Sequence, residues 1–184
     1  MPGNFKKEDL RILRTKKVLL TAIFKLLKLR NFNQITVNDL CEEAMISRTA
    51  FYSHYNDKYN LLEHLLTDMQ SKIITKQYSY DEAEKLVNDF AKDHKMVIKN
   101  LVEKADMETS KLLCDFLLPL LNIGISNPEK PDNLNDVIIA NFCCGGLLNY
   151  LLWQVENNFP KNIQTMNPYI YDVLKKFQQC DEEA

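Results

Sequence analysis

Apolar residues recur with a helical period along almost the whole chain. In residues 8–30, one stripe is apolar and another carries basic and hydroxyl side chains. This pattern predicts one amphipathic helix of about six turns, with its apolar stripe in the core. The residues of that stripe are Leu13, Leu20, Ile23, Phe24 and Leu27.

A short helix is predicted after the break at residues 31–33. Thr36 is followed three residues later by Asp39, which is close to a capping box. The helix that these residues open is expected to end near Ala44. Ser47 is a second candidate N-cap, for a very short helix that runs to residue 52 or 53. Two short helices joined by a turn of a few residues are typical of a helix-turn-helix motif.

The outward face of the second short helix suits the major groove of DNA. Phe51 and Tyr55 can anchor this helix in the core, because both are large and apolar. Arginine matches guanine edges, threonine a phosphate or a thymine methyl group, and tyrosine the backbone. On pattern alone, an ordinary polar surface helix is the alternative. The residues expected to face outward are Arg48, Thr49, Tyr52 and Ser53.

The rest of the sequence predicts further helices and no strands, and therefore an all-α fold. Pro119 is expected to kink the third of these helices, and the proline- and asparagine-rich residues 127–133 form the clearest loop. We expect a three-helix helix-turn-helix domain at 1–56 and a second helical domain at 57–184. The predicted C-terminal helices span 58–78, 81–104, 109–125, 134–158 and 162–177.

Charge is distributed unevenly along the 184 residues. Residues 1–60 hold 11 Lys and Arg and 6 Asp and Glu, a net charge of +5, whereas the remainder holds 12 and 19, a net charge of −7. A basic N-terminal part on an acidic body indicates that the first part binds a polyanion such as nucleic acid.

Several classes of chemistry find no support in the sequence. The five cysteines include no C-x-x-C pair, the three histidines have no metal-ligand spacing, and there is no glycine-rich phosphate loop or G-x-S-x-G segment. We therefore expect no enzyme activity, no metal and no cofactor. No apolar window is long enough to cross a membrane, and the N-terminus lacks the apolar region of a signal peptide, so a cytoplasmic protein is expected.

Residues 15–66 resemble the DNA-binding domain of the TetR/AcrR family of transcriptional regulators. The family pattern has a basic helix, an I-T-V-x-D/E-I/L-[AC] entry, a turn, and S-x-x-[TA]-[FL]-Y-x-[HY]-[FY]-x-x-K-x-x-L. Over a dozen positions agree without a gap, although the turn, Met45-Ile46, lacks the more frequent glycine. The matching residues are Ile35-Thr36-Val37, Asp39-Leu40-Cys41, Ser47 through Tyr55, Lys58 and Leu61.

The C-terminal part is similar, more loosely, to a subgroup of small regulators from Gram-positive bacteria. This subgroup includes a dihydroxyacetone-kinase activator, which acts through a partner protein. The shared features are Phe142-Cys-Cys-Gly145-Gly146-Leu147, Trp153, Glu156-Asn157-Asn158, Pro160 and Met166.

The resemblance implies a set of DNA contacts for this chain. Thr36 would meet a phosphate through its hydroxyl and amide at a helix N-terminus, and Ser47 would cap the reading helix. Arg48 and Thr49 would approach base edges. The remaining contacts, to the sugar-phosphate backbone, would come from Tyr52, His54 and Lys58.

A small-molecule pocket and a dimer surface are expected in the C-terminal part. The candidate pocket residues are aromatic or histidine side chains, although aromatics at helical spacing more often belong to a core. The helix at 134–158 is apolar on most sides in its middle, which indicates cover by its own core and by a second copy. Candidate pocket residues are Phe90, His94, Phe116, Tyr150 and Trp153, and candidate interface residues are Gly145, Gly146, Leu147, Tyr150 and Leu151.

Together these features predict a homodimeric regulator, most simply a repressor, that binds a palindromic double-stranded DNA operator and responds to a small effector. The alternative is a protein of the same fold that acts as an activator or co-regulator through a protein partner. A small helical enzyme has no supporting residues.

Overall fold

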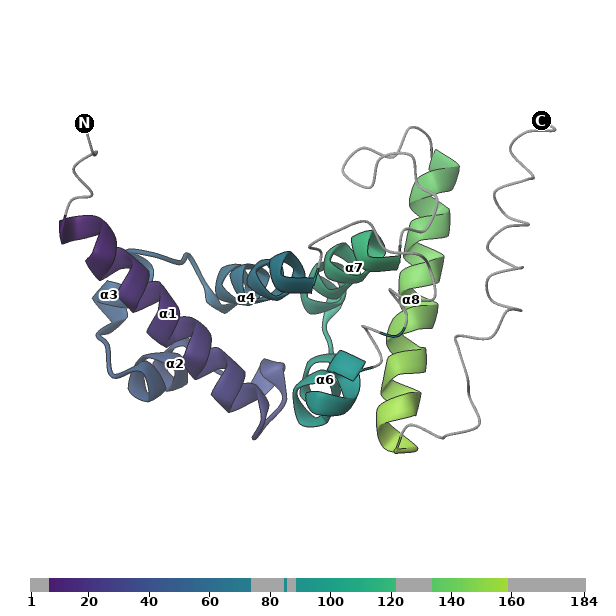
Figure 1. The fold of residues 1–184 in the computed structure, drawn as a ribbon, viewed down its shortest axis with the longest axis horizontal. Helices are drawn as coiled ribbons and strands as arrows, with labels where there is room; N and C mark the ends of the chain where they lie inside the picture. The colour runs from purple at the N-terminus through teal and green to yellow at the C-terminus, as the bar shows by residue number, and fades with distance from the viewer. Residues whose placement is uncertain (1–6, 74–84, 86–88, 122–133, 159–184) are drawn as a thin grey trace.

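The computed structural model describes residues 7–73, 85, 89–121 and 134–158, and within them every regular element is a helix (Figure 1). The predicted all-α fold is confirmed. The predicted helix at 162–177 lies outside the described residues, as do residues 74–78 and 122–125 of two others. The elements are α1 (Lys7–Leu27), a 3-10 turn η1 (Phe32–Gln34), α2 (Val37–Ala44), α3 (Arg48–Tyr52), α4 (Lys58–Ile73), α6 (Lys95–Val102), α7 (Met107–Leu121) and α8 (Leu134–Glu156).

The N-terminal helices and α8 lie at opposite ends of the described structure (Figure 1). At one end, α1 packs against α2, which in turn contacts α3. Helix α4 leads from this group to α7, and both α6 and α7 pack on α8. The predicted domain boundary between residues 56 and 57 stays a prediction, although α4 begins next to it.

The face of α1 that is buried in the core overlaps only in part with the predicted face. Ile23 and Leu27 are buried as expected, but Leu13 is 61% exposed, and Leu20 and Phe24 are only half-buried. The pattern alone did not separate the two stripes, because both are apolar in the middle of the helix. The buried stripe consists of Leu19, Ala22, Ile23, Leu26 and Leu27.

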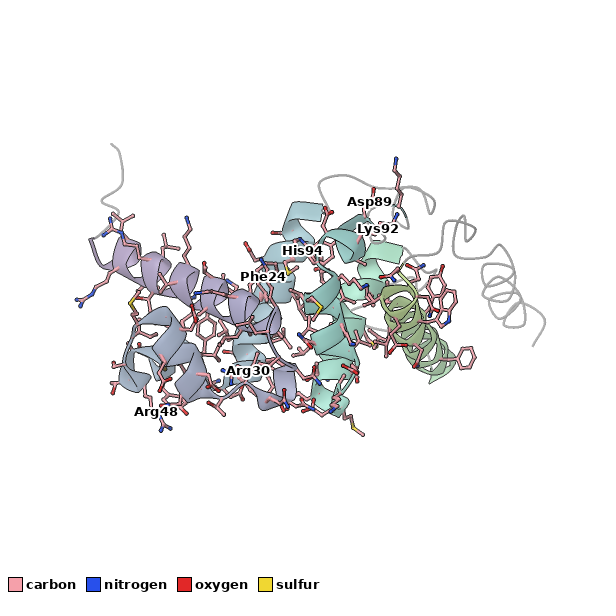
Figure 2. All side chains as sticks on the ribbon, turned by 90° about the horizontal axis from the view of Figure 1, so that it is seen from below. Phe24, Arg30, Arg48, Asp89, Lys92 and His94 are labelled. Atoms are coloured by element: carbon pink, nitrogen blue, oxygen red, sulfur yellow. The ribbon has the colours of Figure 1, made fainter. Side chains whose placement is uncertain are left out.

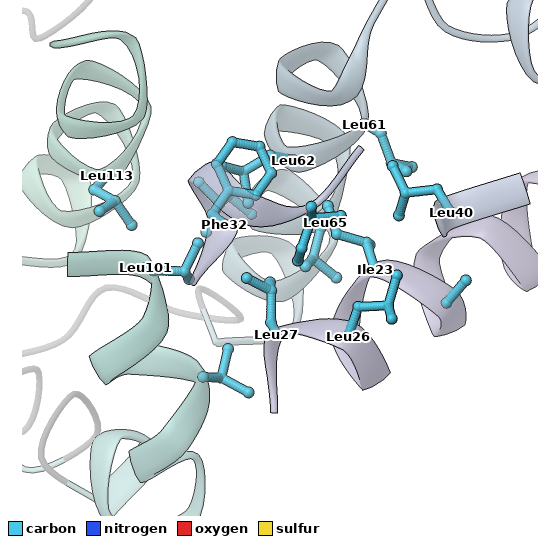
Figure 3. Close-up of a cluster of buried hydrophobic side chains, with 14 of the residues drawn as sticks. Ile23, Leu26, Leu27, Phe32, Leu40, Leu61, Leu62, Leu65, Leu101 and Leu113 are labelled. Atoms are coloured by element: carbon cyan, nitrogen blue, oxygen red, sulfur yellow. The ribbon is translucent and has the colours of Figure 1, made fainter. Parts of the chain in front are cut away.

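One hydrophobic cluster joins the N-terminal helices to α4 and to the helices beyond it (Figure 3). Phe32 of η1 is almost fully buried near its centre, and its ring meets Tyr59 of α4 edge-on at 5.4 Å. The end of α1 is fixed by a buried hydrogen bond, in which the Asn100 side-chain amide of α6 donates to the Leu27 carbonyl at 2.9 Å. The turn after α1 thus receives both apolar and polar contacts from the rest of the chain.

The single helix predicted at 81–104 is interrupted. Residues 89–93 are helical, His94 adopts φ −119° and ψ 31°, and α6 then starts at Lys95. Hydrogen bonds from the His94 amide to the Phe90 carbonyl and from the Ile98 amide to the His94 carbonyl carry the chain across this bend. The pattern gave no signal for the interruption, because it needs neither glycine nor proline.

Helix α7 starts two residues earlier than predicted, and its N-terminus has a clear physical cause. Asp106 precedes the helix, and its Oδ1 accepts from the Thr109 amide at 2.8 Å, as an N-cap side chain does. Its Oδ2 accepts from the Tyr59 hydroxyl of α4 at 2.6 Å. The N-cap of α7 is therefore also a contact with α4.

Helix α8 has a buried side and an exposed side. Leu151, predicted in the dimer interface, is 5% exposed and belongs to the chain's own core, and its place in an interface stays a prediction. Gly145 and Gly146 are exposed, and a Cβ at either would meet no atom within 4 Å. The side chain of Leu147 is outside the described part of the structure. Among the described residues of one chain, no neighbour packs so closely that it would require glycine at these two positions.

We predict that Asn100→Ala lowers the free energy of unfolding by about 1–3 kcal/mol, because it leaves the buried Leu27 carbonyl without its donor. Chemical denaturation measures this change. Asn157→Ala is the matched control, since the Asn157 amide makes an equivalent 2.8 Å bond to the Trp153 carbonyl at an exposed site. An equal loss in both variants would contradict a special role for the buried bond.

Candidate nucleic-acid interface

The start of α2 is a complete capping box. The Thr36 hydroxyl oxygen accepts from the Asp39 amide at 3.2 Å, and the Asp39 carboxylate accepts from the Thr36 amide at 2.8 Å. The Thr36 hydroxyl also donates to this carboxylate at 2.6 Å. These bonds, chiefly those from Thr36, hold the pKa of Asp39 below its ordinary value, with Arg30 adding to the shift from 2.9 Å.

This geometry changes the role expected of Thr36. Both donors proposed for phosphate, its hydroxyl and its amide, already point at the Asp39 carboxylate. An anion at this helix end would instead meet the amides of Val37 and Asn38, which the capping box does not use. The local sequence thus fixes the helix start more directly than it supplies a phosphate contact.

The turn between α2 and α3 is tight. Met45 ends α2 in the left-handed conformation, with φ 54° and ψ 44°, and is 91% exposed. Its amide and that of Ile46 bond back to the carbonyls of Glu42 and Cys41. Left-handed backbone at a non-glycine residue is strained, and these two backbone hydrogen bonds hold the turn in that conformation.

Helix α3 is short, capped and anchored on one side only. The Ser47 hydroxyl accepts from the Ala50 amide at 3.1 Å, which confirms the predicted N-cap. Phe51 and Tyr55 are buried, whereas Arg48 and Thr49 are exposed. Figure 2 shows Arg48 at the free edge of the molecule. The predicted division of this helix into an anchored and an open face is confirmed.

The open face of α3 includes Tyr52. Its ring meets Phe51 edge-on at 5.4 Å, and the Arg48 guanidinium carbon lies 5.9 Å from its centroid. His54, after α3, is half-buried. Behind this face, the Tyr55 hydroxyl and His64 Nδ1 of α4 are 2.5 Å apart, and burial raises the pKa of Tyr55 to about 12.

Lys58 is placed differently from the other predicted contacts. Its ammonium donates to the carbonyls of Phe32, Asn33 and Ile35 at 3.1, 3.3 and 3.0 Å. It also lies 4.7 Å from the centre of the Phe32 ring. Burial lowers the pKa of Lys58, and the Asp106 carboxylate opposes part of that shift. Because an ammonium has three N–H donors and all are used here, a phosphate contact would require one of these bonds to break.

The predicted pocket residues fall into three groups in the described part of the structure, and their common site stays a prediction. Phe90 and His94 lie together, with ring centres 4.5 Å apart. His94 also lies beside Phe24 of α1 (Figure 2). Phe116 is buried in α7 near a second, much smaller cavity. Tyr150 and Trp153 stack on each other on α8 with ring centres 6.4 Å apart. The first pair lines a cavity of about 850 Å³.

Two further features bear on the kind of site present. The described residues contain no group of three or more His, Cys, Asp or Glu side chains placed to hold a metal ion. Among the same helices, none combines the length and apolar character needed to cross a membrane.

The fold and the exposed face of α3 define a helix-turn-helix protein. Residues 19–65 match the family model described as bacterial regulatory proteins, tetR family. A 49-residue stretch is 37% identical to the uncharacterized HTH-type transcriptional regulator YxbF of Bacillus subtilis strain 168. That stretch is 27% of this chain, and the chain spans only 13% of that relative's length.

Two solved structures have a similar fold. A TetR transcriptional regulator from Streptococcus agalactiae 2603V is 22% identical, with a TM-score of 0.57 over 94% of this chain and 96% of that one. The dihydroxyacetone kinase operon activator DhaS is 16% identical, with a TM-score of 0.50 over 78% and 85%. Residues 19–65 therefore carry a helix-turn-helix domain of the TetR type.

We predict that Lys58→Met lowers the free energy of unfolding by about 1–3 kcal/mol, because three carbonyls lose a charged donor while the apolar stem is kept. Thermal or chemical denaturation measures this loss. Lys111→Met, at an exposed position of α7, is the control and should change little.

The same variant separates the two roles considered for Lys58. If the ammonium serves only the turn, the salt dependence of DNA binding stays that of the wild type. A phosphate contact would instead reduce the slope of log affinity against log salt by about one unit. That reduction, together with unchanged stability, would restore the role expected from the sequence.

Proposed function

We propose that this protein is a transcriptional regulator that binds a palindromic operator as a homodimer, with α3 in the major groove. The observation that carries the proposal is the open face of α3, where Arg48, Thr49 and Tyr52 are exposed on a capped helix. Fixed backbone at both ends holds these side chains in a defined register for base edges.

The hydrogen-bond donors of the predicted contact residues fall into two groups, those that are free to meet DNA and those that already bond within the protein. Arg48 keeps an exposed guanidinium, the side chain most often found on guanine. Thr49 and Tyr52 flank it and can reach a thymine methyl group or the backbone. Lys58, by contrast, donates to backbone carbonyls, and Thr36 donates to the neighbouring Asp39 carboxylate. Recognition therefore depends mainly on α3.

A helix of this length contacts only a few base pairs, so a second copy is needed to extend the site. The exposed side of α8 supplies a surface for it: Phe142, Gly145, Gly146, Asn149 and Trp153 lie on one helical stripe. Phe142 is 67% and Trp153 42% exposed. Large apolar groups beside glycines on one stripe favour close packing against another helix.

In this proposal the regulator is a repressor that a small effector controls. Effector binding would change the separation of the two α3 helices, and the coupling could be no larger than the difference in effector binding free energy between the two separations. The contacts of α4 with α7 and of α1 with α6 provide the physical connection between the DNA-binding helices and the rest of the chain.

Arg48→Ala is expected to weaken binding to the specific operator by about 1–3 kcal/mol, the size of one good base-edge contact. Stability should stay close to the wild type, since the side chain is exposed. A band-shift titration on specific and unrelated duplexes makes the measurement, with Arg11→Ala, at an exposed position of α1, as the matched control. Equal specific affinity for wild type and Arg48→Ala would place Arg48 outside the groove.

Gly146→Leu should weaken the dimer without harming the single chain. A Cβ there meets nothing within 4 Å in the chain, and leucine is a better helix former than glycine by close to 1 kcal/mol. Gel filtration with light scattering should therefore show more monomer, and operator affinity should fall. Lys111→Leu adds the same side chain to an exposed site on α7 and should leave the dimer intact. A fully dimeric Gly146→Leu protein would move the interface elsewhere.

A further inference from the structure

A cleft of about 850 Å³ lies between α1, α4 and the segment that contains Phe90 and His94. It includes the stripe of α1 that the core does not use, with Leu13, Leu20 and Phe24. Its volume falls in the range of small-molecule sites, about 300–1,000 Å³. An apolar stripe that stays open on an otherwise packed helix is thus part of a concave surface.

The inner walls of the cleft are apolar and aromatic. Phe24 of α1 and Phe90 both contact the His94 ring, at 5.3 and 4.5 Å between ring centres. Met69 of α4 lines the cleft and is half-buried. Half-buried aromatic and methionine side chains around one space can exchange water for an apolar ligand at a gain in free energy.

The charged groups of the cleft favour an anion. Lys16 and Lys17 are consecutive on α1 and both line it, whereas Asp68 is the one acidic residue among the described residues that line it. The hydroxyl of Thr21 lines the same wall and donates to the Lys17 carbonyl at 2.9 Å. Two ammonium groups beside an apolar wall match a ligand with one acid group and an apolar body.

We propose that this cleft binds an amphipathic organic anion, with its acid group at Lys16 and Lys17 and its apolar body among Phe24, Met69 and Phe90. The inference names the chemical class and the place of the effector, and to that extent it rests on the proposed function. A cation would face two ammonium groups against one carboxylate. A fully polar anion would leave the aromatic walls in water.

A matched pair of dyes tests the proposal on the full chain. The anionic probe is 8-anilinonaphthalene-1-sulfonate, and the neutral probe is N-phenyl-1-naphthylamine, which has the same aromatic body without the sulfonate. Fluorescence titration, excited beyond the tryptophan band, should give one sulfonate site per chain. Its affinity should fall at least fivefold in the double variant Lys16→Gln/Lys17→Gln, while the affinity of the neutral probe stays unchanged.

Further variants locate the probe and separate charge from shape. Thr21→Trp, at an exposed position whose side chain lines the cleft, should weaken both probes at least fivefold, and Met69→Trp provides a second filling change from α4. Lys111→Gln removes an exposed charge on α7 and should change neither probe. Circular dichroism confirms that each variant is folded.

Unchanged sulfonate binding in the folded filling variants would overturn the proposed site. Equal sulfonate affinity in the wild type and the lysine double variant would overturn the proposed ligand class, and so would the absence of any saturable site. The titrations contain no DNA, and band shifts of the protein without dye test operator binding. Failure of the cleft and failure of the proposed function are therefore distinguishable.

Discussion

The ammonium of Lys58 fixes the turn between α1 and α2, and the position of α4 depends on it. The turn leaves the carbonyls of Phe32, Asn33 and Ile35 facing a common point, which a group with three N–H donors can satisfy. Because that group is on the first residue of α4, the helix must start beneath the turn. The next residue, Tyr59, then reaches the N-cap of α7.

As a consequence, some side-chain hydrogen-bond donors of the DNA-binding unit stabilise its fold, and others remain available to bind DNA. Satisfying buried carbonyls is worth more to the fold than an exposed ion pair, since an unpaired buried group costs its full desolvation. Lys58 therefore faces the turn, and Thr36 uses its donors on the neighbouring Asp39 carboxylate, although both belong to the family's contact pattern. What stays available is the face of α3, where Ser47 and the strained turn at Met45 fix the backbone.

Local rules predicted what local interactions decide. The capping box at Thr36, the N-cap at Ser47 and the anchored face of α3 all depend on residues within four positions of one another, and the structure has them. The core stripe of α1 and the bend at His94 depend on which distant helix packs where, and no local pattern contains that information. The three carbonyls that accept hydrogen bonds from Lys58 lie 23 to 26 residues away in sequence. A local sequence pattern therefore could not predict these bonds either.

Helix α1 is the element that both functions share. Its buried stripe holds α2 and thereby α3, while its neighbouring stripe forms a wall of the cleft. A ligand that contacts α1, α4 and Phe90 together gains affinity only in arrangements that keep the three walls at the right spacing. By linkage, the factor by which that ligand changes operator affinity equals the factor by which the operator changes ligand affinity. Because α1 lines the cleft and packs on α2, which contacts α3, a ligand in the cleft would touch the helix that supports the DNA-reading unit.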